Sequence, residues 1–194
     1  MRSCLRSAVA LLLVMTAITG IAYPLTLTGL AGVLFPVQAA GSVITVGGRA
    51  SGSALIGQSF SDPKYFWGRP SATTPQAYNA LASTGSNLGP LNPDLLENVR
   101  TRAAQLRAAD PDNAQPVPVD LVTASASGLD PEISIAAASF QAPRIARLRN
   151  LDPRIVQTLI RSHAHAKLLG VLGEPRVNVL ALNLALDRVA PSVP

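Results

Sequence analysis

The chain has 194 residues, of which 48% are hydrophobic and only 14% are charged. That charged share is about half of what is usual for a soluble domain. The formal charge is +5, but the basic residues form no Lys/Arg run of the kind that binds nucleic acid, so we expect no nucleic-acid partner. Cys4 is the only cysteine, which excludes an intramolecular disulfide.

An apolar stretch near the N-terminus predicts a transmembrane helix. No charged residue occurs from Ser7 to Gly48, and Ala8–Phe35 is strongly apolar. About 20 such residues cross the hydrocarbon core of a bilayer, and a proline such as Pro24 is tolerated within them. Arg2 and Arg6 flank only the N-terminal end. The positive-inside rule therefore predicts a single-pass protein of the cell (inner) membrane, with a cytoplasmic N-terminus and an extracytoplasmic C-terminal domain.

A cleaved signal peptide is the alternative interpretation of this stretch. Val37-Gln38-Ala39 resembles a small-residue cleavage site. However, the apolar core of a signal peptide spans only about 7–15 residues, and the run here is roughly twice as long. We therefore predict a permanent anchor over residues 1–36, followed by a soluble domain over residues 37–194.

The soluble domain is predicted to begin with a hairpin and a long loop. Gly41–Phe60 contains a β-rich stretch followed by Gly47-Gly48, which suits a tight turn between two strands. Ser61–Pro93 is crowded with Gly, Pro, Ser and Asn. An irregular loop of this length is uncommon in a compact domain unless it is functional, so this loop is the first candidate for a binding surface.

Helix signals dominate the remainder of the domain. Asn92-Pro93 and Asp152-Pro153 each place a capping residue before a proline at the first helical position. Another helix is expected from about Ser134, interrupted or kinked at Pro143. The residues expected to face the core at helical spacing are Leu95, Val99, Ala103 and Leu106 in the first helix, and Ile155, Leu159 and Ala166 in the last.

Three further stretches complete the predicted fold. Val117–Thr123 has the composition of a buried strand, and Gly170–Pro175 that of a turn. Val177–Val189 is ambiguous, because its apolar residues nearly alternate while Asn178 could cap a helix; we favour a helix. The mixture predicts an α/β or α+β soluble domain preceded by a single N-terminal transmembrane helix.

The common signatures of an enzyme are missing from the sequence. It contains neither the phosphate-cradling G-x-x-x-x-G-K-[ST] loop nor the G-x-S-x-G nucleophile motif, so we expect no catalytic residue. His163 and His165 stand two positions apart, whereas a helical metal pair needs i, i+4 spacing, so we expect no metal site. Ser125, Ser127, Asp130 and His163 could form a hydrolytic set, although nothing in their spacing requires it.

Three polar segments that contain glycine are candidates for binding. Tyr65–Ser71 joins three adjacent aromatic residues to Arg69, residue types that are enriched at interfaces, but the aromatics could equally pack beneath the loop. Ser83–Gly89 could offer N–H groups to an anion or form a plain turn. Val122–Pro131 leads from the predicted strand toward a helix, where α/β domains often bind ligands. A capped strand–helix connection is the alternative there.

Together these segments resemble one known family, the C subunit of the bacterial Kdp potassium-transporting ATPase. One motif alone would be weak, but six motifs in order behind a single membrane helix are highly specific. The six are Gly52–Gln58, Phe66–Ser71, Gly85–Leu88, Val122–Pro131, Gln141–Ala146, and Val177–Leu180 with Leu182–Asp187. Two positions depart from the family: Thr84 stands where it often has Gly, and Glu132 stands where it commonly has His or another polar residue.

The resemblance implies an accessory subunit of an ATP-driven potassium import complex, without hydrolytic motifs of its own. Its implied partners are an ATP-hydrolysing pump subunit, a potassium-channel-like subunit and the lipid bilayer. The family's C subunit is described as a catalytic chaperone that raises the ATP affinity of the pump subunit. A family glutamine linked to nucleotide contact matches Gln141, with Ser125, Ser127 and Gly128 as nearby candidates. No cofactor is expected to bind tightly, and ATP would be met only through a transient complex with the pump subunit.

Partner contact is expected from the matching motifs, through Phe66, Trp67, Arg69, Ser86, Asn87, Asp130 and Arg144. The predicted orientation conflicts with direct nucleotide contact, because it places the domain outside the cytoplasm while ATP is inside. We therefore favour stabilisation of the assembly and an indirect effect on ATP affinity. A secreted or periplasmic ligand-binding module and a serine-type hydrolase are the alternatives.

Overall fold

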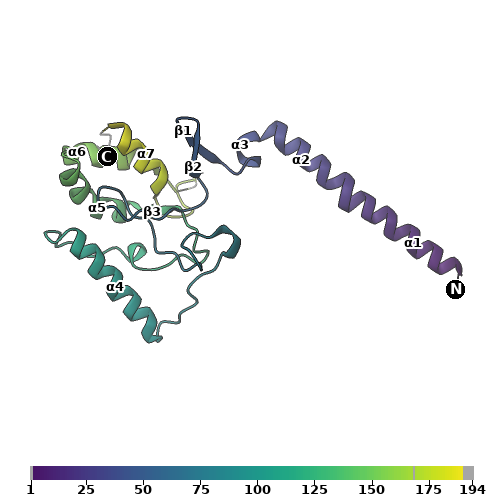
Figure 1. Cartoon of the computed structure of the whole chain (residues 1–194), viewed down its shortest axis with the longest axis horizontal. Helices are drawn as coiled ribbons and strands as arrows, with labels where there is room; N and C mark the ends of the chain where they lie inside the picture. Colours follow the sequence, from purple (N-terminus) through teal and green to yellow (C-terminus); the bar gives the residue numbers. More distant parts are fainter. Residues whose placement is uncertain (1, 168, 190–194) are drawn as a thin grey trace. The chain divides into compact units, whose positions relative to one another are not determined.

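The structure is a computed structural model that describes residues 2–167 and 169–189. It divides into two compact units, one extending to Ser51 and the other beginning at Gly52 (Figure 1). The boundary predicted after residue 36 marks a different feature, the end of the apolar helix. That helix belongs to the first unit, and all the candidate site residues belong to the second.

The first unit begins with a long apolar helix in three parts: α1 (Arg2–Thr16), the π-helical η1 (Ala17–Ala22) and α2 (Tyr23–Leu34). The 32 residues of Ser3–Leu34 have a mean hydropathy of 2.1 in their most apolar window, none of which is buried. At about 1.5 Å per residue the helix is about 48 Å long, more than the roughly 30 Å of the hydrocarbon core. The predicted membrane-spanning helix is therefore confirmed in length and composition.

Pro24 explains the π-helical stretch. Proline has no N–H to offer the carbonyl of Gly20, and its ring would collide with that carbonyl in a regular α-helix. The chain widens instead, and the N–H of Tyr23 bonds to the carbonyl of Ile18, five residues earlier. The widened turn lets the helix continue past the proline to Leu34.

A short helix α3 (Pro36–Ala39) leads into the predicted hairpin of β1 (Val43–Val46) and β2 (Arg49–Ser53). The connecting residues Gly47 and Gly48 have φ values of +57° and +77°, as a two-residue hairpin turn of the primed type requires. The long loop that follows is also confirmed. Its only regular element between Ala54 and Asn92, a fully described stretch, is the 3₁₀ turn η2 (Ala80–Ala82).

Three helices of the second unit begin at the predicted caps: α4 (Pro93–Ala109), α5 (Ile135–Leu148) and α6 (Pro153–Ser162). In each case the cap side chain accepts a hydrogen bond from a backbone N–H: Asn92 from Asp94 (2.8 Å), Ser134 from Ala137 (3.0 Å) and Asp152 from Arg154 (2.7 Å). Although Pro143 lies inside α5, the helix continues past it to Leu148.

The predicted apolar face is right for α4 and only partly right for α6. In α4, Leu106 is buried, and Val99 and Ala103 pack against the core. In α6 the fully buried residues are Val156 and Ile160, whereas Ile155 is 40% exposed. Leu159 is partly buried beside them, and Ala166 is exposed beyond the end of the helix. The buried stripe of α6 is therefore displaced by one residue from the prediction.

Val117–Thr123 is not a strand. It contains the 3₁₀ turn η3 (Val119–Leu121), which begins after Pro118 at φ −60°. The N–H groups of Leu121, Val122 and Thr123 bond to carbonyls only three or four residues earlier, so the backbone needs no partner strand. Leu121 and Val122 are nevertheless buried, which accounts for the apolar composition that led to the wrong prediction.

The second unit contains one antiparallel sheet with the order β3-β5-β4. Its strands are β3 (Glu132–Ser134), β5 (Arg176–Asn178) and β4 (Ala164–His165), and Ile133 lies opposite Val177. The ambiguous C-terminal stretch resolves into both alternatives, because β5 is followed directly by α7 (Val179–Val189). Asn178 Oδ1 accepts the N–H of Ala181 at 2.9 Å, as the predicted helix cap does.

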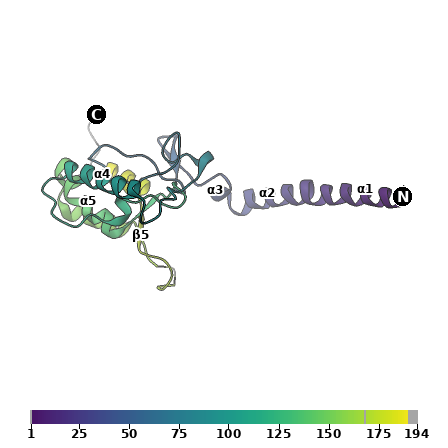
Figure 2. The ribbon, with the colours of Figure 1, turned by 90° about the horizontal axis from the view of Figure 1, so that it is seen from below.

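The core of the second unit surrounds α5. Helix α5 packs against α6, β3 and β5, and α7 packs against α6 and β5. Figure 2 shows the predicted Gly170–Pro175 turn, which leads into β5, projecting away from these helices. The short antiparallel strands and separate helices make the domain α+β rather than α/β. Its fully buried apolar side chains include Phe66, Ala137, Ile145, Val156, Ile160, Val177, Leu182 and Leu186.

Candidate functional site

Two buried amide side chains, Gln141 of α5 and Asn183 of α7, hydrogen-bond to the backbone of Tyr65–Ser71, which we call the aromatic segment. We call this pair of side chains the amide clamp. Asn183 Oδ1 accepts the N–H of Phe66 (2.9 Å), and its Nδ2 donates to the Phe66 carbonyl (3.0 Å). Gln141 holds Trp67 in the same way, through Oε1 (2.8 Å) and Nε2 (3.1 Å). Buried backbone groups need hydrogen-bond partners, so the clamp takes the place of a neighbouring strand.

Arg144 reinforces the clamp from one turn further along α5. Its Nη2 donates to the Tyr65 carbonyl (2.8 Å) and to Gln141 Oε1 (3.0 Å), and its guanidinium lies 4.4 Å from the centroid of the Trp67 ring. Burial lowers the pKa of Arg144 to about 10, an effect that the carboxylate of Asp110 opposes. Arg144 therefore remains charged at neutral pH and serves to hold the aromatic segment.

The clamp shows how the predicted residues of this segment are used. Phe66 and Arg144 are buried and Trp67 is half-buried, so much of the segment packs beneath its own loop. Gln141 is 1% exposed, its Oε1 accepts two hydrogen bonds and its Nε2 donates two. Nucleotide contact through Gln141 would have to replace these bonds. The binding roles of these residues stay predictions.

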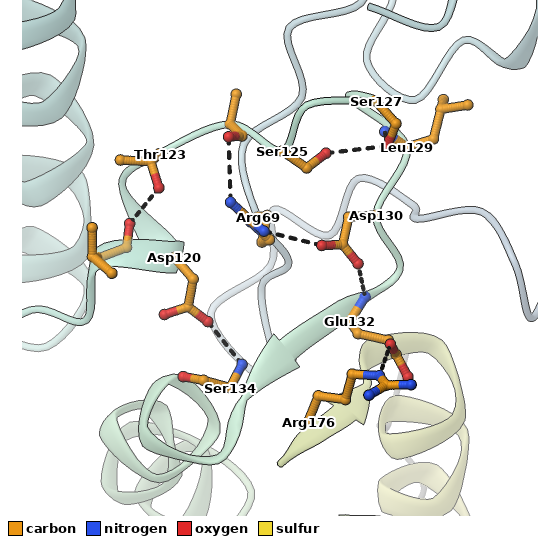
Figure 3. A network of polar contacts seen from close by, with 12 residues as sticks. Arg69, Asp120, Thr123, Ser125, Ser127, Leu129, Asp130, Glu132, Ser134 and Arg176 are labelled. Carbon is orange, nitrogen blue, oxygen red and sulfur yellow. Dashed lines mark hydrogen bonds and ion pairs between the residues drawn. The ribbon is translucent and has the colours of Figure 1, made fainter. Parts of the chain in front are cut away.

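A second group of predicted residues meets at what we call the arginine junction, the contact of Arg69 with the segment Ala124–Asp130 (Figure 3). Arg69 Nη1 lies 3.1 Å from Asp130 Oδ2, and its Nη2 donates to the Ala124 carbonyl at 3.3 Å. The other oxygen of Asp130 accepts the N–H of Glu132 at 2.9 Å. Asp130 thus joins Arg69 to the start of β3, and the junction links residues 61 positions apart.

The segments Tyr65–Ser71 and Ser83–Gly89 are both hydrogen-bonded to Ala124–Asp130. Ser71 Oγ donates to the Gly128 carbonyl (2.7 Å), while Ser83 Oγ and the N–H of Thr84 both donate to the Ser127 carbonyl (3.0 Å each). Gly128 has a φ of +67°, and a Cβ there would lie 2.6 Å from the carbonyl oxygen of Thr84. Only glycine fits this position without strain, because it lacks a Cβ.

Tyr78 packs beneath the arginine junction. Its hydroxyl donates to the Arg69 carbonyl at 2.5 Å. Burial, together with the smaller effect of the Asp130 carboxylate, raises the pKa of Tyr78 to about 12, and Arg69 opposes both effects. Gly57 makes room for the ring, since a Cβ on Gly57 would lie 2.3 Å from Cε1 of Tyr78. The phenol is therefore a hydrogen-bond donor at any physiological pH.

An open pocket of about 550 Å³ lies beside the junction, and Arg69, Ser125, Ser127 and Asp130 line it. The structure therefore brings together two of the nucleotide-binding candidates and two of the partner-contact candidates. Ser125 is 7% exposed and Ser127 is exposed, with their Oγ atoms 3.4 Å apart. Gln141 does not line this pocket; it lies in the amide clamp instead.

Ser86 and Asn87 are exposed residues of the irregular stretch directly after Thr84, whose N–H bonds to Ser127. Gly85 makes the close approach, because a Cβ there would lie 2.9 Å from the Ala126 carbonyl oxygen. Asn87 has a φ of +52°, a conformation that asparagine tolerates better than most residues. Both side chains are accessible to a partner, as the prediction for them requires.

The residues of the hydrolytic hypothesis have separate partners. His163 ends α6, where its Nδ1 contacts Ser162 Oγ (3.1 Å) and the Leu159 carbonyl (2.9 Å), while Asp130 is paired with Arg69. No hydrogen bond joins His163 to Ser125 within the described residues, so a Ser–His pair is not formed. His165 lies on β4 rather than on a helix. Among all the residues that the structure describes, no group of three or more His, Cys, Asp or Glu could hold a metal ion.

Two residues that shape the site were not predicted. Asn183 is a polar residue between Leu182 and Leu184, and it is 1% exposed. A lone amide within an apolar helical stretch was the available signal for it, because buried polar side chains are almost always hydrogen-bonded. Tyr78 gave no comparable signal, since it stands in the middle of an irregular loop.

Comparison with known proteins identifies the family. Residues 5–188 match the KdpC family model, described as K+-transporting ATPase, c chain. The chain is 64% identical over 190 residues to the potassium-transporting ATPase KdpC subunit of Variovorax paradoxus, covering 98% of both chains. It is 57% identical over 190 residues to the KdpC subunit of Dechloromonas aromatica, covering 98% of this chain and 100% of the relative. The resemblance seen in the six motifs is thereby confirmed, and the chain belongs to the KdpC family.

Proposed function

We propose that this chain is the accessory subunit of an ATP-driven potassium import complex, that it stabilises the assembly, and that the helix Ser3–Leu34 anchors it in the cell membrane. The observation that carries the proposal is the family match over residues 5–188, which spans both the apolar helix and the second unit. The relatives' names place them in a potassium-transporting ATPase. The polar residues of the second unit support a non-catalytic role, because they hold loops together instead of forming a nucleophile–base pair.

In this proposal the second unit lies outside the cytoplasm and contacts the ATP-hydrolysing and channel-like subunits. Arg2 and Arg6 support this orientation, since positively charged flanks remain on the cytoplasmic side. The chain then raises the ATP affinity of the pump subunit indirectly, by binding one conformation of the complex more tightly than another. Direct nucleotide contact through Ser125, Ser127, Gly128 or Gln141 belongs to the opposite orientation.

The single cysteine makes the orientation testable. Cys4 reports the N-terminal side, and the double variant Cys4→Ser, Ala166→Cys reports an exposed position of the second unit. In intact spheroplasts a membrane-impermeant maleimide should label the cysteine at position 166 and leave Cys4 unlabelled. Permeabilised cells are the control, in which both cysteines should react. Labelling of Cys4 alone in intact spheroplasts would instead place the second unit in the cytoplasm.

Two measurements test the accessory role. The tagged chain, solubilised in detergent, should co-purify with the pump and channel-like subunits and keep the mass of the uncleaved sequence. A complex reconstituted without it should need a higher ATP concentration for half-maximal hydrolysis, and adding the chain back should restore the lower value. A free monomer in the aqueous fraction with a mature start near Ala40 contradicts the membrane-anchored subunit.

A further inference from the structure

A second cavity, which shares Arg69 with the open pocket described above, lies between α4 and the loop that carries Trp67 and Tyr78. Its volume is about 210 Å³, and α4 contributes Arg102, Gln105 and Leu106 to its lining. Residues spaced i, i+3 and i+4 share one face of a helix, so α4 presents one guanidinium and one amide on the face that lines this space. Phe60 and Trp67 supply aromatic surface to the same lining.

Two arginines, Arg69 and Arg102, line this cavity, and of the two only Arg69 has a carboxylate partner. The only hydrogen bond of Arg102 among the described residues runs from Nη1 to the Val122 carbonyl, at 3.3 Å. Partial burial lowers the pKa of its guanidinium, as expected for a cation removed from water. Four other arginines of this unit each pair with a carboxylate: Arg69 with Asp130, Arg147 with Asp110, Arg149 with Asp187 and Arg176 with Glu132.

The chemistry of the lining selects the ligand. A partly desolvated guanidinium is costly without an anion, and its planar fork suits the two oxygens of a carboxylate or phosphate. Gln105, one turn away on α4, adds an amide that can donate to the same anion. The volume of about 210 Å³ is below the roughly 300–1,000 Å³ typical of sites for drug-sized ligands, and it suits a single small anion.

We propose that this cavity is a binding site for a small oxyanion, held by Arg102 and Gln105 beside the ring of Trp67. The anion has two possible sources, inorganic phosphate from the surroundings or the carboxylate side chain of a neighbouring subunit. The site adjoins the arginine junction, because Arg69 lines this cavity as well. The two differ in their charges: Arg69 is paired with Asp130, whereas Arg102 has no part in that pair.

Trp67 is the only tryptophan of the chain, so its fluorescence reports on this cavity directly. The purified full chain in detergent is titrated with inorganic phosphate at constant ionic strength. Arg102→Gln is compared with Arg100→Gln, which removes the same charge from an exposed position of α4. A saturable change is expected in the wild type and in Arg100→Gln. Arg102→Gln should bind at least about tenfold more weakly, as expected for the loss of charge-assisted hydrogen bonds.

A response that fails to saturate, or that is equal in both variants, overturns the proposal. Circular dichroism checks that each variant is folded. If Arg102→Gln does not fold, Arg102→Lys replaces it, since lysine keeps the charge but lacks the planar fork. Folded Arg102→Lys must then bind phosphate more weakly than the wild type, and equal affinity overturns the proposal as well.

A second experiment, on the assembled complex, identifies the source of the anion. This experiment rests on the proposed function, because it requires the partner subunits. Radiolabelled phosphate is added to the complex containing either the wild-type chain or Arg102→Gln. Retention that depends on Arg102 indicates a free anion. Binding to the isolated chain that disappears in the complex indicates a neighbour's carboxylate in the cavity. Failure of the isolated chain to bind phosphate overturns this inference and leaves co-purification, the test of the accessory role, untouched.

Discussion

The amide clamp predicts a large loss of stability from Asn183→Leu. Leucine has the same number of side-chain heavy atoms in the same branched arrangement, but the substitution removes both hydrogen bonds to Phe66, which is 0% exposed. A buried polar group left without a partner costs about 1–3 kcal/mol, so the two groups cost about 2–6 kcal/mol. The added apolar surface of leucine offsets about 1–2 kcal/mol. The difference spans about 0–5 kcal/mol, and we expect a net loss near its midpoint, about 2–3 kcal/mol, a large part of the 5–15 kcal/mol or so typical of a domain.

Urea denaturation of the full chain in detergent measures this loss, with Trp67 fluorescence as the probe because Trp67 adjoins the clamp. Asn98→Leu is the matched control, since Asn98 is exposed on α4 and the same change there should stay within about 0.5 kcal/mol. If Asn183→Leu loses less than about 1 kcal/mol relative to this control, then other groups satisfy Phe66, and the clamp is not what holds the aromatic segment.

Two further predictions follow from the loops around the arginine junction. Gly128→Ala should destabilise the domain by at least about 1–2 kcal/mol in urea denaturation, because it forces a Cβ into a left-handed conformation. Gly89→Ala, at a position where a Cβ meets nothing within 4 Å, should change stability by less, and equal effects would contradict the steric argument. Tyr78 should remain protonated until pH about 12 in an ultraviolet titration. Folded chains then hold a proton that unfolded chains release, so stability should fall as pH rises from 10 toward 12, and Tyr78→Phe should lose this dependence.

The helix starts could be predicted because their causes are local. Asn92, Ser134 and Asp152 each satisfy an N–H of the first helical turn, and that pattern can be recognised without knowing the fold. The same holds for the hairpin turn at Gly47-Gly48 and for the apolar helix, whose length and lack of charge are properties of the sequence itself.

The errors arose where tertiary contacts or a local turn overrode the composition of a segment. Strands β3, β4 and β5 are two or three residues long, too short to show an alternating pattern. Val117–Thr123 has the composition of a strand, but Pro118 starts a 3₁₀ turn that satisfies its own backbone. In α6 both Ile155 and Val156 are apolar, so composition alone could not settle which of them the core would bury.

For the site, the sequence identified the right segments but not their connections. Arg69 and Asp130 were both candidates, yet their ion pair spans 61 positions and depends on how two loops fold against each other. Gln141 was chosen by resemblance, and its bonds to Trp67 became visible only once α5 was placed beneath the aromatic segment. Arg102 belongs to none of the motifs recognised in the sequence, and its proposed role in anion binding follows only from the cavity that it lines.

The π-helical stretch at Ala17–Ala22 has a consequence for any helix that lies alongside the anchor. One additional residue in a turn rotates everything that follows by about 100°, because a regular α-helix has about 3.6 residues per turn. A continuous seven-residue seam along the whole anchor is thereby interrupted. The parts before and after Ala17–Ala22 consequently point different sides toward a common neighbour, and each can pack against a different one.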